Sequence, residues 1–173
     1  MYKFLLSLCF LFFVSACTTV NVEPKLSQQQ TLTSLLQNLD TEIDYKEAEV
    51  LSSEILRETA KLRKTFNPVA QPHFNNFLIN VGVKEKGLCY QWSDALYLHF
   101  SKRRYKHFEF HLLVANRGEY FFEHNVFVVS AKGKAVMDGI IIDPWRKPGE
   151  LYIARVKEDK KYNWEHRIER ETL

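Results

Sequence analysis

Apolar residues recur at helical spacing in roughly the first hundred residues and alternate with polar residues in most of the remainder. The helical spacing predicts one helix over residues 28–40 and a second over residues 45–65, where Asp44 and Glu47 form a capping-box pattern at the start. Residues 68–87 contain prolines and a short apolar segment, which predicts a loop with a helical turn.

The alternating pattern predicts a sheet after these helices. Three alternating runs, over residues 108–114, 120–130 and 135–143, predict three strands, and weaker patterns predict two more over residues 151–156 and 162–167. Helices that precede an antiparallel sheet are typical of an α+β fold. The sequence therefore predicts N-terminal helices followed by an antiparallel sheet.

The composition indicates one folded domain. The chain has 173 residues, of which 46% are hydrophobic and 26% charged, and this mixture excludes a disordered tail or a fibrous repeat. A domain holds roughly 100–200 residues, so the length leaves no room for a second one. The net charge of +3 is spread along the chain without a concentrated basic face, so no nucleic acid is expected as a partner.

The N-terminal segment has the layout of a secretory signal. One positive charge, Lys3, is followed by an apolar run over residues 4–14 and by small residues before Cys17. At about 1.5 Å per residue, this run is too short to cross a hydrocarbon core of about 30 Å. The tetrad VSAC at residues 14–17 resembles the lipobox of bacterial lipoproteins.

That resemblance implies that Cys17 becomes the lipidated first residue of the mature protein. Acyl chains contribute about 0.8 kcal/mol per buried methylene, so two or more chains anchor a protein stably in a lipid membrane. Thr18 stands where lipoproteins retained at the inner membrane usually carry Asp, which implies, for a Gram-negative cell, sorting to the periplasmic face of the outer membrane. The expected organisation is a signal peptide over residues 1–16, a lipidated tether over 17–27 and one domain over 28–173.

Cys89 is the only free thiol expected in the exported domain, because Cys9 leaves with the signal and Cys17 carries lipid. Such a thiol is either buried and inert or reactive. Apolar residues at helical spacing, preceded by Gly87, predict a third helix that starts at or near Cys89. The positive end of a helix dipole favours a thiolate, so this position favours the reactive alternative.

His124 and Asp143 lie on successive predicted strands. If the turn between these strands is centred on Gly133 and Lys134, as in a type II′ hairpin, His124 pairs directly with Asp143 on one face of the sheet. A Cys89 helix packed against that face would complete a nucleophile, base and orienting acid. Taken singly, His124 would more often be a hydrogen-bonded structural histidine, and Asp143 could simply begin an Asp-Pro turn.

The segments GLCYQW, EHNVFVV and DGIIIDPW, in this order, resemble the catalytic core of the transglutaminase-like superfamily, a branch of the papain-like cysteine enzymes. The resemblance covers about residues 70–147 and implies a transglutaminase-like fold with the cysteine at a helix N-terminus. It also implies acyl transfer or amide hydrolysis through a thioester, with Cys89 as nucleophile, His124 as general base and acid, and Asp143 as the orienting group.

The sequence departs from the superfamily pattern before the cysteine. Papain has a glutamine there, whereas residues 83–86 read VKEK, so the expected oxyanion donor is the backbone N–H of Cys89. No acidic calcium-binding loop is present in the sequence, and neither a metal nor another cofactor is expected. An alternative zinc site would use His107, Glu109 and His111, which share one strand face, although a solvated face explains the same alternation.

These observations predict a lipid-anchored thiol enzyme of the bacterial cell envelope, a peptidase or amidase rather than a cross-linking acyl transferase, because nothing in the sequence indicates a dedicated amine site. Its expected partners are a peptide or protein substrate in the envelope and the lipid membrane that holds acylated Cys17. The alternative is a catalytically silent lipoprotein that binds an envelope protein or a peptidoglycan peptide.

Overall fold

The computed structural model describes residues 26–148 and 150–171, so the predicted signal peptide and Cys17 lie outside the described residues. The helices within these ranges are α2 (Leu26–Gln37), α3 (Tyr45–Phe66), α4 (Pro72–Asn80) and α5 (Cys89–Phe100). The strands are β1 (Phe108–Ala115), β2 (His124–Ala131), β3 (Ile140–Asp143), β4 (Tyr152–Arg155) and β5 (Glu165–His166), and short 3-10 turns include η2 (Val136–Asp138), η3 (Val156–Glu158) and η4 (Ile168–Arg170). None of the described helices is long and apolar enough to cross a membrane.

The helices correspond closely to the predicted ones, with two differences. The second and third predicted helices are confirmed as α3 and α5, and α5 begins at Cys89. The first helix, α2, begins and ends earlier in the chain than residues 28–40. Residues 72–80 of the predicted loop over 68–87 form the helix α4; Pro72 lies in its first turn, where the missing backbone N–H costs no hydrogen bond.

The strands form the predicted antiparallel sheet, in the order β4-β3-β2-β1-β5. Two of them begin later than the alternation indicated. Residues 120–123 form a turn in which the Phe122 and Glu123 N–H groups donate to Glu119 O at 2.8 and 2.7 Å, and residues 136–138 form η2. Local hydrogen bonds therefore replace ladder bonds in both segments, and β5 is likewise shorter than predicted.

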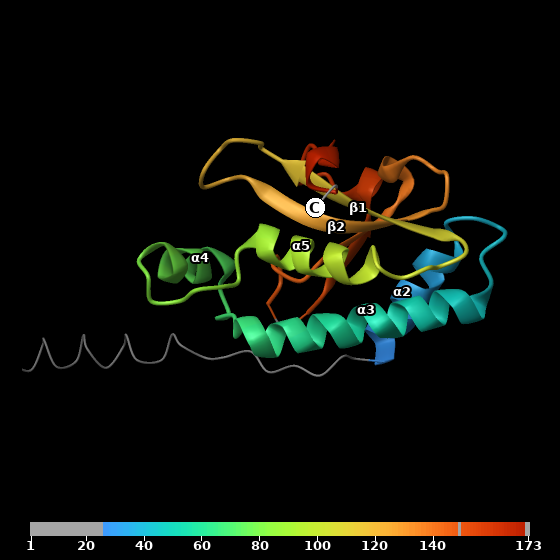
Figure 1. Ribbon diagram of the computed structural model, residues 1–173, viewed down its shortest axis with the longest axis horizontal. Coiled ribbons are helices and arrows are strands. Elements are labelled where there is room, and N and C mark those ends of the chain that lie inside the picture. The colour runs from blue at the N-terminus through green and yellow to red at the C-terminus, as the bar shows by residue number, and fades with distance from the viewer. Residues whose placement is uncertain (1–25, 149, 172–173) are drawn as a thin grey trace, which may run out of the picture.

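The helices cover one face of the sheet, and α5 lies between α3 and the strands (Figure 1). The core between the layers contains leucines of α2 and α3, Leu96 and Phe100 of α5, and Phe127 and Val129 of β2. The opposite face carries a smaller apolar cluster that is covered by η2, η3 and the segment before β5; it comprises Leu113, Val126, Val128, Ile141 and Val156, with Val136, Met137, Tyr152 and Trp164 packed against it. Every residue of β2 is consequently buried, including its first, His124.

The register between β2 and β3 differs from the predicted one by two residues. The structure pairs Phe127 with Ile142, so Asp143 continues opposite Val126 instead of opposite His124. Lys134 N donates to Ala131 O at 3.0 Å, so the turn is centred on Lys132 and Gly133, one residue earlier than predicted. The 3-10 turn η2 then adds residues to the connection before β3 begins. Since side chains alternate with a period of two, this shift leaves His124 and Asp143 on the same face as diagonal neighbours.

Candidate active site

The chain is held in a defined conformation just before Cys89. The backbone N–H groups of Gly87 and Leu88 both donate to Gln91 Oε1, at 2.7 and 3.0 Å, so the side chain at the third helical position caps the start of α5. Cys89 is the first residue of α5, and its N–H is one of the groups that a helix leaves without an internal acceptor. This arrangement presents both the thiol and a backbone donor at the positive end of the helix dipole.

Gly87 is required by its neighbour Asn75. The buried Asn75 side chain donates to Gly87 O at 3.2 Å and accepts from Val69 N at 3.4 Å, so it connects α4 to the segments on either side. Gly87 has a φ of +121°, and a Cβ at this position would lie 2.7 Å from Asn75 Nδ2. Only glycine combines this conformation with this close approach.

His124 and Asp143 form a buried hydrogen-bonded pair. His124 Nε2 lies 2.7 Å from Asp143 Oδ2, and the two side chains are only 2% and 1% exposed. The predicted contact between the imidazole and the carboxylate is therefore confirmed, although it is made along a diagonal of the sheet. The contact places the orienting carboxylate on one nitrogen of the ring and leaves the other nitrogen, Nδ1, for a different partner.

Arg146 and Asp159 extend this pair into a network that the sequence analysis did not identify. Asp143 Oδ2 also accepts from Arg146 Nε at 3.0 Å, and Asp143 Oδ1 accepts from the backbone N–H groups of Trp145 and Arg146, both at 3.0 Å. Arg146 Nη2 in turn donates to Asp159 Oδ2 at 2.8 Å. An Asp-Pro-Trp-Arg turn with a second acid downstream is the sequence signal for this network, but the pairing depends on the long-range approach of Asp159.

The carboxylate sets the protonation state of the histidine. Burial of the His124 ring lowers its pKa, but the charge of Asp143 and its hydrogen bond, with a further contribution from the Cys89 side chain, raise the pKa to about 9. Burial raises the pKa of Asp143, yet His124 and Arg146 outweigh it and hold that pKa below its usual value. At neutral pH the pair is therefore an imidazolium beside a carboxylate.

Aromatic rings enclose the imidazole. The ring centroids of Trp145, Tyr162 and Trp164 lie 4.8, 4.9 and 5.7 Å from that of His124. The guanidinium of Arg146 lies 3.9 Å from the centroid of the Tyr152 ring, within the range of a cation–π interaction. These rings exclude water from the charged pair, which strengthens the electrostatic interaction between its members.

The thiol of Cys89 contacts the residues on either side of His124. Sγ lies 3.7 Å from Glu123 O and 3.9 Å from Asn125 Nδ2. Helix α5 packs on the face of the sheet that carries Phe127 and Val129, so the prediction that it would cover the His124 face is wrong. Cys89 instead approaches His124 at the first residue of β2, through its contacts with the two neighbouring residues.

No aligned hydrogen bond joins His124 Nδ1 to any described residue, although this atom is buried. The Cys89 side chain nevertheless lies close enough to contribute to the raised pKa of His124. Because Nε2 is bonded to Asp143, Nδ1 is the nitrogen left to exchange a proton with the thiol. A loose nucleophile–base contact of this kind is common in sites without substrate.

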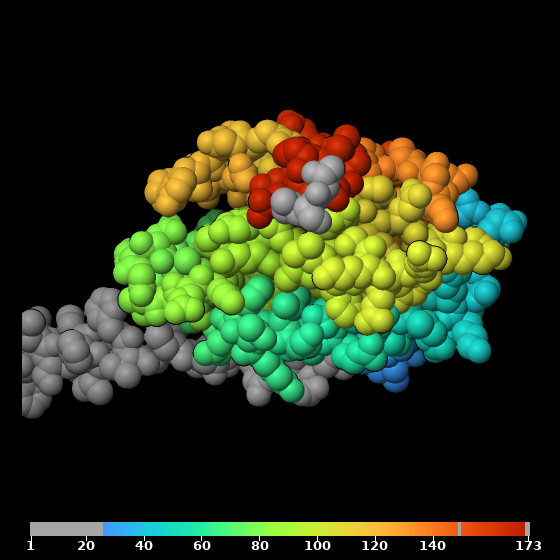
Figure 2. Space-filling view, in the orientation of Figure 1, coloured from blue at the N-terminus to red at the C-terminus, as the bar shows by residue number. Residues whose placement is uncertain are grey.

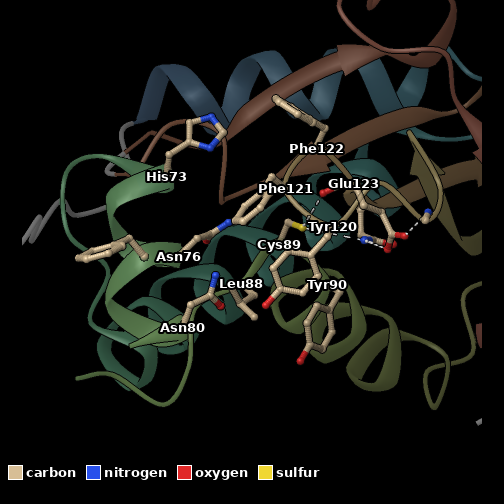
Figure 3. A pocket seen from close by; sticks show the side chains of 13 residues that line it. His73, Asn76, Asn80, Leu88, Cys89, Tyr90, Tyr120, Phe121, Phe122 and Glu123 are labelled. Atoms are coloured by element: carbon tan, nitrogen blue, oxygen red, sulfur yellow. Dashed lines mark hydrogen bonds between the residues drawn. The ribbon is translucent and has the colours of Figure 1, made fainter. Parts of the chain in front are cut away.

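The thiol borders a cavity of about 520 Å³ that opens between α4 and the β1–β2 loop. Figure 2 shows the hollow between the amber loop and the green helix. In the close view, the side chains of His73, Asn76 and Asn80 and those of Tyr120, Phe121 and Phe122 lie around Cys89 (Figure 3). Cys89 itself is only 7% exposed, so a substrate would reach it through this cavity.

Asn76 is a second potential donor that the sequence analysis missed. Its Oδ1 accepts from Trp145 Nε1 at 3.1 Å, which fixes the orientation of the amide and leaves its Nδ2 group for the cavity that Asn76 lines. Asn76 lies on α4, which was predicted as a loop, so the sequence offered no reason to place this amide near Cys89.

The alternative zinc site over His107, Glu109 and His111 is not formed. His107 Nδ1 contacts Glu47 Oε2 at 2.6 Å, and Glu109 Oε2 accepts from Gly133 N at 3.0 Å, so two of these three side chains are bonded elsewhere. The structure thus brings together Cys89, His124 and Asp143, with Cys17 outside the described residues. Compared with family models, curated proteins and solved structures, the chain matches none, so the resemblance to the transglutaminase-like superfamily stays a prediction.

Proposed function

We propose that this protein is an envelope-anchored thiol enzyme that transfers or hydrolyses acyl groups through a thioester on Cys89. One observation carries the proposal: a buried imidazole is bonded to a carboxylate through Nε2, while a thiol at the start of a helix lies beside it and borders a cavity. Peptidase or amidase activity is favoured over cross-linking, since no described feature of the cavity marks a separate amine site.

In the first step, the Cys89 thiolate attacks the carbonyl carbon of an amide, and the C–N bond breaks as the amine leaves. The imidazolium of His124 supplies the proton that this amine needs, and Asp143 stabilises the imidazolium before the transfer. The pKa of about 9 keeps His124 protonated at neutral pH, so the proton is in place before the substrate arrives. The products of this step are a free amine and a thioester.

In the second step, water attacks the thioester carbonyl. Neutral His124 accepts a proton from this water, the C–S bond breaks, and a carboxylic acid leaves while Cys89 and protonated His124 are restored. An amine that replaced water would give a new amide instead. The negative oxygen formed in both steps would be stabilised by the Cys89 N–H and by Asn76 Nδ2, the two donors available at the cavity.

The lining of the cavity favours a substrate with an apolar side chain. Tyr120, Phe121 and Phe122 are exposed and line it from the β1–β2 loop, while Phe77 lines it from α4. Burying apolar substrate surface against such rings contributes roughly 25 cal/mol per Å². A peptide segment with an aromatic or aliphatic residue near the scissile bond fits this surface better than an acidic one.

The envelope location rests on the N-terminal tetrad alone. If Cys17 is lipidated, replacement by serine should abolish fatty-acid labelling of the protein, whereas Cys89→Ser should leave the labelling unchanged. Palmitate that persists on the Cys17→Ser protein would exclude the lipoprotein anchor without affecting the proposed chemistry.

The chemistry is tested by measuring the rate of iodoacetamide alkylation of Cys89 against pH. A thiolate stabilised by the His124 imidazolium should react far faster than a free cysteine near pH 6, and His124→Ala should lose this advantage. His107→Ala, which changes a histidine that contacts Glu47 and does not line the cavity, is the matched control. An identical profile in wild type and His124→Ala would reject the enzyme and support the alternative, a binding protein without catalysis.

A further inference from the structure

A second group of histidine and carboxylate side chains lies at the β5 edge of the sheet. His111 on β1, His166 on β5 and Glu171 after η4 offer ligand atoms that all lie within 4.8 Å of one another. They come from three separate segments, and the two imidazoles are nearly perpendicular, at 83°, with ring centroids 5.3 Å apart. We propose that these three residues bind one Zn²⁺ ion. This proposal does not depend on the activity of Cys89.

The strongest observation is the state of His111 Nδ1. His111 Nε2 contacts Ser130 Oγ at 3.0 Å, whereas Nδ1 is buried and has no hydrogen-bond partner among the described residues. The nearest carboxylate oxygen, Glu171 Oε2, lies 3.7 Å from Nδ1. A proton on Nδ1 would be too far from this oxygen for a hydrogen bond, and a lone pair there would face another acceptor.

A divalent cation between the two atoms removes this conflict. Zinc binds imidazole nitrogen and carboxylate oxygen at about 2.0–2.2 Å, so two ligands of one tetrahedral ion lie about 3.4 Å apart. The observed 3.7 Å between Nδ1 and Oε2 is close to this separation and longer than a hydrogen bond. His166 Nε2 completes three protein ligands once it leaves its 2.9 Å contact with Glu171 Oε1. A fourth position would remain for water.

The groups behind the ligands already orient them. Ser130, which is fully buried, bonds the far nitrogen of His111, and Leu112 N donates to Glu171 Oε1 at 2.6 Å. A glutamate carboxylate is ionised near neutral pH, as a metal ligand must be. His166 is 27% exposed, which gives the ion a path from solvent.

The donor set favours zinc over calcium or magnesium. Calcium and magnesium prefer oxygen ligands, whereas two imidazoles and one carboxylate form a set that is typical of zinc. The ion would also connect the C-terminal segment to β1, since Glu171 follows η4 and His111 lies within the sheet.

The test is to titrate the metal-free full-length chain with Zn²⁺ alone and to measure the binding heat by calorimetry. We expect one ion per chain, and His111→Gln and His166→Gln should each weaken binding by at least about 10–100-fold. The control is His107→Gln, because His107 directly precedes β1 and also contacts a glutamate, Glu47. This substitution should leave the affinity for Zn²⁺ unchanged. Thermal unfolding of each metal-free variant verifies that it is folded.

Zinc held by Cys89 and His124 is the competing result, and two measurements distinguish it. Cys89→Ala should retain the bound zinc, and Co²⁺ bound in place of zinc should show no thiolate charge-transfer band. Loss of binding in Cys89→Ala, a thiolate band, unchanged binding in both His111→Gln and His166→Gln, or no binding to the wild type would each overturn the proposed site.

Discussion

Two histidine–carboxylate pairs of the same sheet differ in burial more than in geometry. His124 Nε2 lies 2.7 Å from Asp143, and His166 Nε2 lies 2.9 Å from Glu171. The first pair is 2% and 1% exposed, whereas the second is 27% and 15% exposed. The hydrogen bonds are alike, but only the first of these two pairs is shut off from solvent, by the rings of Trp145, Tyr162 and Trp164.

The difference shows what determines the chemistry of such a pair. In the buried pair, Asp143 has Arg146 as a second cationic partner, so the charges remain inside the protein and hold a proton on His124. In the outer pair, Glu171 is shared with a backbone N–H and faces a histidine nitrogen that has no partner among the described residues. The first environment favours proton transfer, and the second leaves lone pairs for a metal.

The largest expected difference between the pairs is in stability. Asp143→Asn should lower the free energy of unfolding by about 3–5 kcal/mol, because it leaves the buried His124 imidazolium without its counter-charge, while Arg146 keeps only Asp159. In the metal-free protein, Glu171→Gln should cost only about 1 kcal/mol or less, since that pair is partly solvated. Urea denaturation of both variants measures the contrast, and equal losses would mean that burial does not distinguish the pairs.

The next effect concerns pH. The folded pKa of His124, about 9, lies above its ordinary value of 6.5, so its stabilising contribution is present below pH 6.5 and is lost as the pH rises through 9. The free energy of unfolding should fall over this interval, by on the order of 3 kcal/mol. His124→Gln should remove this loss, whereas His166→Gln should retain it. A slope that survives in His124→Gln would assign it to another group.

The smallest expected effect concerns the connection between the two regions. Arg167, next to His166, donates to Asn125 Oδ1 at 2.5 Å, and Asn125 Nδ2 lies 3.9 Å from Cys89 Sγ. The hydrogen bond that Arg167→Met removes contributes about 1 kcal/mol to holding Asn125 in place. Its loss should therefore change the rate of Cys89 alkylation by less than about tenfold. Arg57→Met, which removes an exposed ion pair with Glu54 on α3, is the control and should change nothing.

The positions of the main elements follow from local patterns in the sequence. Helix α3 begins after Asp44, whose carboxylate accepts from Glu47 N at 2.8 Å as the capping pattern predicted, and α5 begins at Cys89. Element ends were less predictable. The alternation over residues 120–123 continues that of β2, yet a turn consumes the backbone hydrogen bonds there, and periodicity carries no information about that competition.

By itself, the sequence determined that Cys89 stands at a helix start and that His124 and Asp143 share a sheet face, because helix starts and strand alternation depend on neighbouring residues. The prediction of a shared face was correct although the predicted register was wrong, because a shift of two residues leaves each side chain on the same face. Only the tertiary structure decided the Arg146–Asp159 contact, the cavity beside α4 and the meeting of His111, His166 and Glu171. These features join segments far apart in the chain, and their contacts depend on how whole elements pack together.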